Sequence, residues 1–431
     1  MADFDAVVIG AGCAGSAAAY ELARAGQSVL LVERGNFAGA KNMTGGRLYT
    51  HALERLIPDF RDRAPLERRV THERITLLAD DAGFTIDFAS QEMKEQGQES
   101  YTVLRAPFDQ WLASEAEAAG AELICGIPVE DLIIDSSGVV GGIVAGGDEI
   151  TADVTVICDG ANSLLASKAV GARMPLPVHM AVGVKQVYEL PADVITNRAM
   201  AQSNSDGSAW LFVGDCTKGH FGGGFAYTNA ESISIGIVAG LEALANGGEA
   251  TVCQMLEDFK AHPCVAPLIA GGKLVEHSGH LVPEGGFDAM PELVGDGALI
   301  AGDAAMMCLN LGYMVRGMDY AISAGQMAGL AAAEALAAGD VSKKGLSRYR
   351  DWLESSFVLK DLEAHRGAPE FLEGFDRMFD DYPKVVRDIM NGMFVVDGLS
   401  GGPLRDAVMP ALKSVGIFNL FKDAKGALKN L

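Results

Sequence analysis

Three glycines near the start of the chain have the spacing at which a backbone turn approaches a phosphate group. Gly10, Gly12 and Gly15 lie in VVIGAGCAG, between an apolar run typical of a strand and an alanine-rich run typical of a helix. The first glycine permits the tight turn, the second lets the backbone approach a pyrophosphate, and the third lets helix and strand pack closely. Glu33 ends the next apolar run, where a carboxylate accepts hydrogen bonds from a ribose. These residues together predict a dinucleotide site, either for FAD or for NAD.

Two later strand-like runs each end in a pair of Asp and Gly. VTVICDG ends at Asp159 and Gly160, and ALIAGD ends at Gly302 and Asp303. Open α/β sheets gather their ligands at the carboxyl ends of their strands. Asp and Gly are also ordinary turn formers, so each pair is either a simple turn or a part of the cofactor site.

The segment that follows Asp303 is apolar and rich in methionine. From Met306 to Gly317 it reads MMCLNLGYMVRG, and it has no His, Lys, Glu or Ser to serve as base or nucleophile. Such a loop suits contact with an apolar molecule beside a redox cofactor, since electron transfer needs no protein nucleophile. Arg316 either hydrogen-bonds that molecule, or offsets charge on the reduced cofactor, or pairs with an acidic neighbour.

The elements that position these residues follow from the periodicity of the apolar side chains. Residues 4–35 predict a strand, a helix and a strand, the βαβ unit that the glycine turn requires. Two more helices are predicted at DQWLASEAEAAG and at DYAISAGQMAGLAAAEALAAGD, and short strands over residues 132–160. From about 176 to 275 apolar residues alternate with polar ones, which predicts an antiparallel sheet carrying one helix, TVCQMLEDFKAH.

These elements predict an α/β fold with a discontinuous cofactor domain, since a cofactor-type strand returns after the alternating region. The cofactor domain is predicted over residues 1–75, 101–175 and 276–345. A β-rich domain is predicted over residues 76–100 and 176–275.

Residues 346–431 are predicted to form a helical C-terminal region. Pro383, Gly392 and residues 398–403 are expected to interrupt its helices. Its last part, from Pro403 to Leu431, carries five Lys or Arg and two Asp, although the whole chain has a formal charge of -23. Apolar residues alternate with the lysines there, so the tail either lies in an anionic membrane interface or packs on its own domain or on a partner.

Composition excludes several classes of function. The chain has 34 Lys and Arg against 57 Asp and Glu, which argues against nucleic-acid binding because phosphate affinity depends on clustered cations. Seven scattered cysteines without a C-x-x-C pair, and histidines without ligand spacing, predict no disulfide framework and no metal site. No signal peptide and no membrane-spanning run is expected.

Longer segments identify a family resemblance. RAPFDQWL, between the glycine turn and Asp159, resembles the FAD superfamily of aromatic hydroxylases and geranylgeranyl reductases. ERGNFAGAKNMTGGRLYTHALERLIPDF, QMLEDFKAHPCVAPLIAGGKLVEHSGHLVPEGG and ALIAGDAAMMCLNLGYMVRG resemble the FixC flavoproteins, which are similar to electron-transfer-flavoprotein:quinone oxidoreductase. The resemblance covers essentially the whole chain. It implies a Rossmann-like FAD domain of the GR2 type, with an inserted sheet domain for a quinone or other substrate.

The resemblance also implies which residues hold the cofactor and which lie near its electron acceptor. The cofactor residues are Gly10, Gly12, Ala14, Gly15, Glu33, Arg34, Gly45, Gly46, Arg47, Arg105, Asp159, Gly160, Gly302, Asp303 and Gly312. The residues expected near a quinone are Met306, Met307, Leu311, Tyr313, Arg316 and Gly317. No residue is expected to act as a catalytic acid, base or nucleophile, because the chemistry belongs to the flavin.

The activity implied by the resemblance is electron transfer within a FixABCX-like complex. The expected partners are two electron-transfer-flavoprotein subunits similar to FixA and FixB, and a ferredoxin-like protein similar to FixX, because the sequence ends at Leu431 without the four-cysteine cluster of longer relatives. The expected acceptor is a membrane quinone, and any electron bifurcation belongs to a flavin of the partners. The expected location is the inner face of the cytoplasmic membrane, as a peripheral protein. The alternative is a stand-alone reductase or monooxygenase similar to geranylgeranyl reductase.

Overall fold

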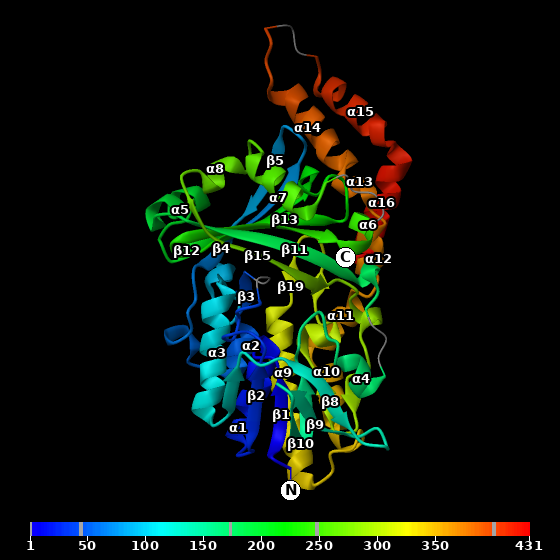
Figure 1. Cartoon of the computed structure of the whole chain (residues 1–431). Helices are drawn as coiled ribbons and strands as arrows, with labels where there is room; N and C mark the ends of the chain where they lie inside the picture. Colours follow the sequence, from blue (N-terminus) through cyan, green and yellow to red (C-terminus); the bar gives the residue numbers. More distant parts are fainter. Residues whose placement is uncertain (1, 43–45, 172–174, 246–249, 399–401) are drawn as a thin grey trace.

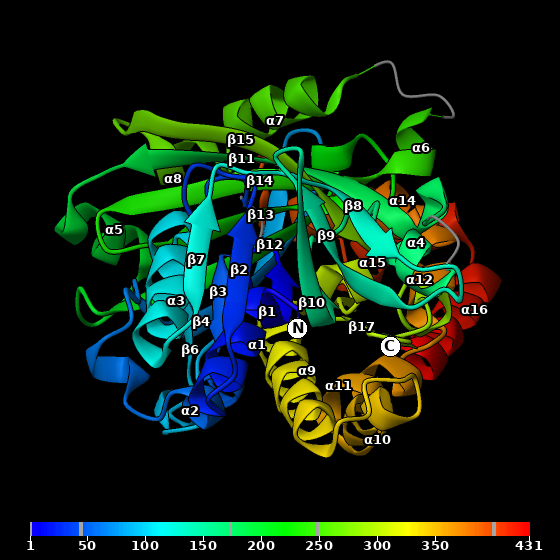
Figure 2. The same cartoon turned by 60° about the horizontal axis from the view of Figure 1, so that its bottom comes forward.

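Two large β-sheets form the body of the molecule in the computed structural model, which describes residues 2–42, 46–171, 175–245, 250–398 and 402–431. In Figure 1 the smaller sheet lies in the lower half with the N-terminus, and the larger sheet crosses above it. Figure 2 shows the same two sheets from below, with α1, α3 and α9 beside the smaller one. The mixed α/β architecture confirms the predicted fold class.

The smaller sheet is the predicted cofactor sheet, and its central strands are parallel. Its strand order is β16-β17-β10-β1-β2-β7, with β8 and β9 extending from β10. Its strands are β1 (Phe4–Ile9), β2 (Val29–Glu33), β7 (Glu122–Cys125), β8 (Val129–Ile134), β9 (Val140–Ala145), β10 (Asp148–Ile157), β16 (Val294–Gly295) and β17 (Ala298–Ile300). β1 pairs with β10 and β2, and β10 pairs with β17, all in parallel, so their carboxyl ends meet at one edge.

The larger sheet has the order β15-β11-β14-β13-β12-β4-β6-β3, with β5 paired to β4. Its strands are β3 (Arg47–Tyr49), β4 (Arg69–Leu78), β5 (Gly83–Phe88), β6 (Ser100–Thr102), β11 (Met180–Glu189), β12 (Asp206–Gly214), β13 (Gly222–Thr228), β14 (Ser232–Gly240) and β15 (Lys273–Pro283). Most neighbours are antiparallel, as predicted, but β12 and β4 run parallel. The sheet therefore joins residues 47–102 to residues 180–283.

Sixteen α-helices lie in the described part of the chain. They are α1 (Cys13–Arg24), α2 (His51–Leu56), α3 (Arg105–Ala119), α4 (Ala166–Val170), α5 (Ala192–Ala199), α6 (Leu241–Ala245), α7 (Val252–Ala261), α8 (Ala266–Ile269), α9 (Met318–Ala338), α10 (Arg348–Ser355), α11 (Phe357–Ala364), α12 (Ala368–Glu373), α13 (Asp376–Phe379), α14 (Asp381–Phe394), α15 (Leu404–Val415) and α16 (Ile417–Asn430). The short turns η3 (Pro177–His179), η5 (Phe287–Ala289) and η6 (Gly302–Ala305), and the strands β18 (Leu309–Asn310) and β19 (Val315–Arg316), complete the elements used below.

Three details of the sequence prediction were wrong. The sheet region carries α5, α6 and α8 as well as the predicted α7, because these three helices are too short to show a helical period. α14 runs through Pro383 without a break, since proline in a first turn removes an amide that has no helical partner. It also runs through Gly392, where a Cβ would lie 2.7 Å from Ala407 Cβ, so this glycine serves the packing of α14 on α15. Residues 399–401 of the third expected break lie outside the described residues.

The division of the chain into domains stays a prediction. The hydrophobic core around β1, β2, β10, α1 and α9 is continuous, and a second core lies between the larger sheet and α7. β3 and most of β4 and β6 fall within the residues predicted for the cofactor domain, but all three strands pair in the larger sheet.

The long helix α9 is the core helix of the cofactor half. Among the described residues it is the one helix that is long and apolar enough to cross a membrane, although no such run was expected from the sequence. However, 61% of its most apolar window is buried inside the protein. A Cβ on Gly325 would lie 2.0 Å from Ala14 O, and one on Gly329 would lie 2.5 Å from Ala18 O. The apolarity of α9 is therefore explained by its packing along α1.

This close packing predicts a stability effect that depends on position. Gly325→Ala should lower the free energy of unfolding by about 1–3 kcal/mol, because the added methyl forces α9 away from the backbone of α1. Gly141→Ala is the matched control, since a Cβ at Gly141 meets nothing within 4 Å. The measurement is urea unfolding of both variants, and equal midpoints for the two would refute the packing argument.

Candidate functional site

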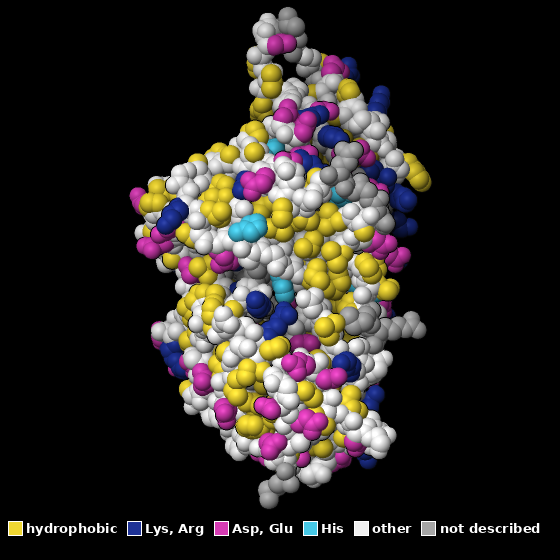
Figure 3. All heavy atoms as spheres, viewed as in Figure 1, with side chains coloured by type: hydrophobic (Ala, Val, Ile, Leu, Met, Phe, Trp, Pro, Cys, Tyr) yellow, Lys and Arg dark blue, Asp and Glu magenta, His cyan; other side chains and the backbone are white. Residues whose placement is uncertain are grey.

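A single large cavity lies between the two sheets and gathers most of the residues singled out in the sequence. Its volume is about 1050 Å³, at the upper end of the usual range for ligand pockets. The carboxyl ends of β1, β10 and β17 line one part of it, and α12 and α13 line another. On the face shown in Figure 3, Lys, Arg and His side chains gather near the middle of the molecule, close to apolar ones.

The glycine turn after β1 lies at the polar end of this cavity. Gly10 has φ +93°, and a Cβ there would lie 2.4 Å from Cys158 O. A Cβ on Gly15 would lie 1.8 Å from Gly10 O, so helix α1 packs directly on the turn. α1 begins at Cys13, with Gly12 as an N-cap that offers no side chain, and Gly12 and Ala14 line the cavity. The first amide groups of α1 are thus available to an anionic ligand such as a pyrophosphate.

Glu33, at the end of β2, binds a backbone amide of the glycine turn and one after its own strand. Its Oε2 accepts from Ala11 N at 3.0 Å and its Oε1 accepts from Gly35 N at 2.6 Å. A carboxylate oxygen has a second lone pair, so Glu33 keeps acceptor capacity for a hydroxyl group. Arg34, the next residue, is exposed and also lines the cavity.

The two Asp residues at strand ends both line the cavity, with Asp159 after β10 and Asp303 in η6 after β17. Asp159 Oδ1 is buried without a hydrogen-bond partner among the described residues. Burial raises the pKa of both carboxyls above the usual range for Asp. Buried acceptors of this kind require donors to replace water, and the hydroxyl groups of a dinucleotide would supply them. The residues present therefore fit the cofactor.

The glycine beside each of these acids shapes the cavity. Gly160 has φ +81° and Gly302 has φ +69°, a conformation that side chains rarely adopt. A Cβ on Gly302 would lie 2.9 Å from Ala14 Cβ, so the turn after β17 packs on the first residues of α1. At Gly302 the end of β17 thus lies close to the start of α1.

A buried ion pair supports the glycine turn from α3. Arg105 donates from Nε and Nη2 to the two carboxylate oxygens of Asp109, each at 2.9 Å. Asn42 Nδ2 donates to Asp109 Oδ2 at 2.5 Å, and Asp109 is fully buried. Arg105 lines the cavity beside Gly12, where a Cβ would lie 4.0 Å from Nη2. A cation at this place favours a phosphate ligand.

Gly46, one of the two glycines expected to line the flavin, lies next to the larger sheet. A Cβ on Gly46 would lie 2.4 Å from the ring of Tyr227, so only glycine fits there. Arg47 forms an ion pair with Glu73, and its Nε donates to Ser100 Oγ at 3.1 Å. Both Gly46 and Arg47 line the cavity, and Gly45 lies outside the described residues.

The apolar segment after Asp303 is a small hairpin rather than a plain loop, because β18 and β19 pair through Leu309 and Arg316. The expected acceptor residues divide into two groups. Leu311, Tyr313 and Gly317 line the cavity, whereas Met306 and Met307 are buried in the protein at 2% and 0% exposure. Gly312, which was expected at the cofactor, also lines the cavity.

Arg316 has the acidic neighbours that the sequence left open. Its Nη1 donates to Asp361 Oδ2 at 2.7 Å, and its Nε donates to Asp319 Oδ2 at 2.9 Å. Tyr320 lies beneath the guanidinium, 4.6 Å from its centre to the ring. These contacts anchor the end of the hairpin to α9 and α11, and a role for Arg316 toward an acceptor stays a prediction.

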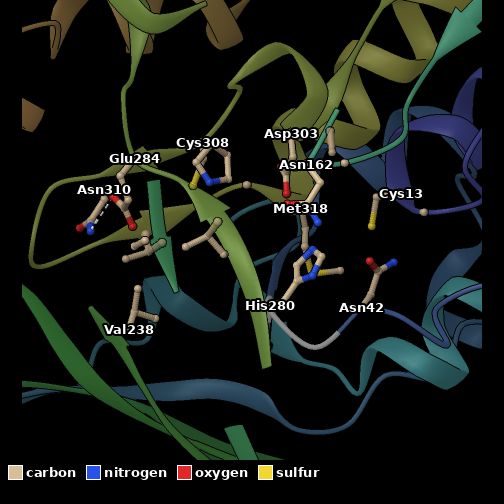
Figure 4. Close-up of a pocket in the computed structure, with 18 of the residues that line it drawn as sticks. Cys13, Asn42, Asn162, Val238, His280, Glu284, Asp303, Cys308, Asn310 and Met318 are labelled. Atoms are coloured by element: carbon tan, nitrogen blue, oxygen red, sulfur yellow. Dashed lines mark hydrogen bonds between the residues drawn. The ribbon is translucent and has the colours of Figure 1, made fainter. Parts of the chain in front are cut away.

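Sequence reasoning missed several side chains that line the cavity. Lys185 lies in β11 and His280 in β15 of the larger sheet, Glu284 follows β15, and Asn310 ends β18. Figure 4 labels His280, Glu284 and Asn310. Burial, with help from the positive charges of Arg105 and Arg34, lowers the pKa of His280 to about 4, so its imidazole is neutral at pH 7. For His280 the sequence offered only the alternation of side chains along β15, and this alternation does not tell which face of a strand borders a cavity.

The apolar end of the cavity was not foreseen either. It is lined by side chains that belong to β13 or its preceding turn, to the C-terminal helices and to the last residue, namely Phe221, Leu372, Phe375, Met378, Phe379 and Leu431. Tyr313 Oη donates to Leu431 O at 3.3 Å, which links the hairpin to the chain end.

Comparison with known proteins assigns the two ends of the chain to family profiles. Residues 5–93 match the profile of FAD dependent oxidoreductases. Residues 368–431 match the profile of the ETF-QO/FixC family C-terminal domain. The second match covers the helices that line the apolar end of the cavity.

Whole-length relatives agree with these profiles. Protein FixC of Salmonella typhi is 50% identical over 420 residues, covering 97% of each chain. A probable electron transfer flavoprotein-quinone oxidoreductase of Escherichia coli (strain K12), YdiS, is 47% identical over 425 residues, covering 98% of each. A geranylgeranyl bacteriochlorophyll reductase-like protein from Thermoplasma acidophilum shares the fold, with a TM-score of 0.72 and 19% identity, covering 98% of this chain and 99% of that one.

The site predicts a specific effect on cofactor binding. Asp303→Ala should weaken FAD binding by about 10- to 100-fold, because it removes a buried carboxylate acceptor whose charge-assisted hydrogen bond is worth about 1.5–3 kcal/mol. The matched control is Asp148→Ala, at the exposed start of β10. Titration of the deflavinated proteins with FAD, followed by flavin fluorescence, measures both. Equal dissociation constants for the two variants would remove Asp303 from the site.

Proposed function

Because the chain belongs to the FixC family of FAD-dependent electron-transfer oxidoreductases, we propose that it passes electrons from an electron-transfer-flavoprotein partner to a membrane quinone. The observation that carries this proposal is the form of the cavity. One continuous space has buried polar acceptors and a helix N-terminus at one end and aromatic and aliphatic side chains at the other. Two molecules, a polar dinucleotide and an apolar acceptor, are accommodated side by side in such a space.

In this proposal the polar end holds FAD. The amides at the start of α1, with Arg105 beside them, bind the pyrophosphate, and Glu33 accepts from the ribose. Asp159 and Asp303 take hydrogen bonds from hydroxyl groups of the cofactor. When bound, FAD supplies the capacity to take up and release electrons singly or in pairs. The chain itself orients the cofactor and excludes water, which suits a reaction without a protein nucleophile.

The apolar end holds the quinone. Leu372, Phe375 and Phe379 offer an apolar surface, and the hairpin residues Leu311 and Tyr313 line the same cavity. A quinone has an apolar ring and tail and two carbonyl acceptors, so it needs mostly apolar contact and few polar partners. The name of the YdiS relative, a probable electron transfer flavoprotein-quinone oxidoreductase, supports this choice.

The partners in this proposal are those of a FixABCX-like complex. Proteins similar to FixA and FixB deliver the electrons, with a ferredoxin-like protein similar to FixX as the intermediate carrier. The support is the identity of about half of the residues to FixC proteins over nearly the whole chain. Electron bifurcation, where it occurs, belongs to the partner flavoproteins.

We also propose a peripheral membrane position through α15 and α16. Their inner face packs on the protein, since Val415 is buried and Asp423 forms an ion pair with Arg377 at 2.6 Å. Their outer face exposes large apolar side chains together with lysines, namely Ile417, Phe418, Phe421, Leu428, Lys422, Lys425 and Lys429. The inner face of the tail supports the alternative in which it packs on the protein, and the outer face supports the alternative in which it lies in a membrane interface.

The electron acceptor is tested by a reconstitution assay. Holoprotein reduced with dithionite should be reoxidised rapidly by decyl-ubiquinone and slowly by oxygen, and NADH or NADPH alone should not reduce it. The measurement is flavin absorbance in a stopped-flow instrument. Oxygen consumption driven by NADPH without any partner would favour the stand-alone monooxygenase and contradict the proposal.

The membrane position is tested with charge substitutions on the outer face. Phe418→Glu combined with Phe421→Glu should lower binding to vesicles containing anionic lipid by about tenfold or more, because it removes apolar contact and adds repulsion. Ile86→Glu, another exposed apolar site on β5, is the control. Vesicle co-sedimentation measures both, and unchanged binding of the double variant would show that the tail does not contact lipid.

A further inference from the structure

A buried carboxyl group lies on the wall of the cavity away from the glycine turn. Glu284 follows directly after β15, is only 8% exposed and lines the cavity. Figure 4 shows it beside Asn310 on one side of the pocket, with Cys13 and Asn42 of the cofactor end on the other. Neither the binding of the cofactor nor the apolar contact with the acceptor uses this group.

Two hydrogen bonds orient the carboxyl group of Glu284. Asn310 Nδ2 donates to Glu284 Oε2 at 3.1 Å. Asn310 Oδ1 accepts from Gly312 N at 2.8 Å, which fixes the amide so that its nitrogen faces the carboxyl. Since Oε2 is occupied as an acceptor, Oε1 is the oxygen that carries the proton in the neutral acid.

Burial and one hydrogen bond, rather than a neighbouring charge, set the pKa of the Glu284 carboxyl. Burial raises the pKa of the carboxyl to about 7, while the hydrogen bond from Asn310 works in the opposite direction. The Cys308 thiol interacts with the charge of Glu284, and the backbone carbonyl of His179 accepts from Glu284 N at 2.8 Å. Asp288, four residues further along the chain, pairs with Arg366. In the described ranges none of them forms an ion pair with the carboxyl.

Glu284 and Asn310 lie next to the apolar end of the cavity. A Cβ on Gly286, two residues after Glu284, would lie 3.0 Å from Pro369 Cγ in α12. A Cβ on Gly312, two residues after Asn310, would lie 3.5 Å from Leu372 Cδ2 in the same helix. Both segments thus contact the helix that lines the proposed quinone region.

We propose that Glu284 is the proton donor for the quinone at the apolar end of the cavity, held in place by Asn310. The inference rests on the proposed function, because reduction of a quinone to a hydroquinone consumes two electrons and two protons. The electrons come from the partner through the bound cofactor. The Oε1–H bond of Glu284 breaks as an O–H bond forms on one quinone oxygen. The carboxylate then takes a proton from water through the cavity, and the second quinone oxygen receives its proton from water.

The test compares acceptors that do and do not need protons. Glu284→Gln keeps the size of the side chain and an acceptor for Asn310, but it has no acidic proton. Reduced holoprotein of this variant should transfer electrons to decyl-ubiquinone about 100-fold more slowly than the wild type, which is the ordinary contribution of a general acid. Ferricyanide takes one electron and no proton, so its reduction should be unchanged. Glu292→Gln, on the exposed surface, is the control for the substitution itself.

Two further measurements separate a proton donor from a structural residue. The carboxylic C=O absorption of the oxidised holoprotein, followed by infrared spectroscopy, should titrate near pH 7 and be missing in Glu284→Gln. The rate of quinone reduction should fall as pH rises through the same range, because the donor is lost on ionisation. Asn310→Ala should move this fall to higher pH, since the carboxylate loses the hydrogen bond that stabilises its charge.

The outcomes distinguish the inference from the function on which it rests. Wild-type rates with decyl-ubiquinone in Glu284→Gln, or equal slowing with both acceptors, would overturn the role of Glu284 and leave the quinone assignment intact. Reduced wild-type protein that reacts with ferricyanide but with no quinone would overturn both.

Discussion

The close approach of α1 to its neighbours is the constraint on which the rest of the structure depends. Gly15 leaves no space between α1 and the turn at Gly10, and Gly325 lets α9 pack directly on the backbone at Ala14. Because these contacts are made by backbone atoms, they fix the distance between β1, β10, β17 and the helix N-terminus with little freedom. The polar end of the cavity is where these elements meet, so its shape depends on close packing at glycine residues.

A second constraint is the separation of polar and apolar groups along one cavity. Asp159 and Asp303 are buried acceptors at the polar end, where we propose that FAD binds, and the helices matched by the FixC C-terminal profile line the apolar end. Electron transfer requires the two ligands to be close, but their recognition requires opposite surroundings. The hairpin of β18 and β19 also lines the cavity, and ion pairs from Arg316 to Asp319 and Asp361 anchor it to α9 and α11. In the proposed function Glu284 lies near the apolar end, where a quinone that is reduced must also be protonated.

The sequence predicted the cofactor half well because its signals are local. The glycine turn, the following helix and the strand ends at Asp159 and Asp303 each follow from residues close together in the chain, and their convergence follows from the parallel order of the strands. The apolar end depends on contacts between distant segments, such as Gly312 with Leu372, which no local pattern reports. Glu284 was hidden for the same reason, since a Glu after a strand is ordinarily solvated. Pro383 and Gly392 were wrongly predicted to interrupt α14, because proline and glycine often end helices. Pro383 lies in the first turn of α14, where proline is tolerated, and Gly392 allows α14 to pack closely on α15.

The central claim is that the apolar end, lined by α12 and α13, binds the electron acceptor. Photolabelling of the holoprotein with an azido-quinone, followed by peptide mapping, tests it most directly. The account predicts label in residues 368–379 and 309–316, and loss of that label when excess decyl-ubiquinone is present. Label confined to other segments, or label that excess quinone does not displace, would contradict it.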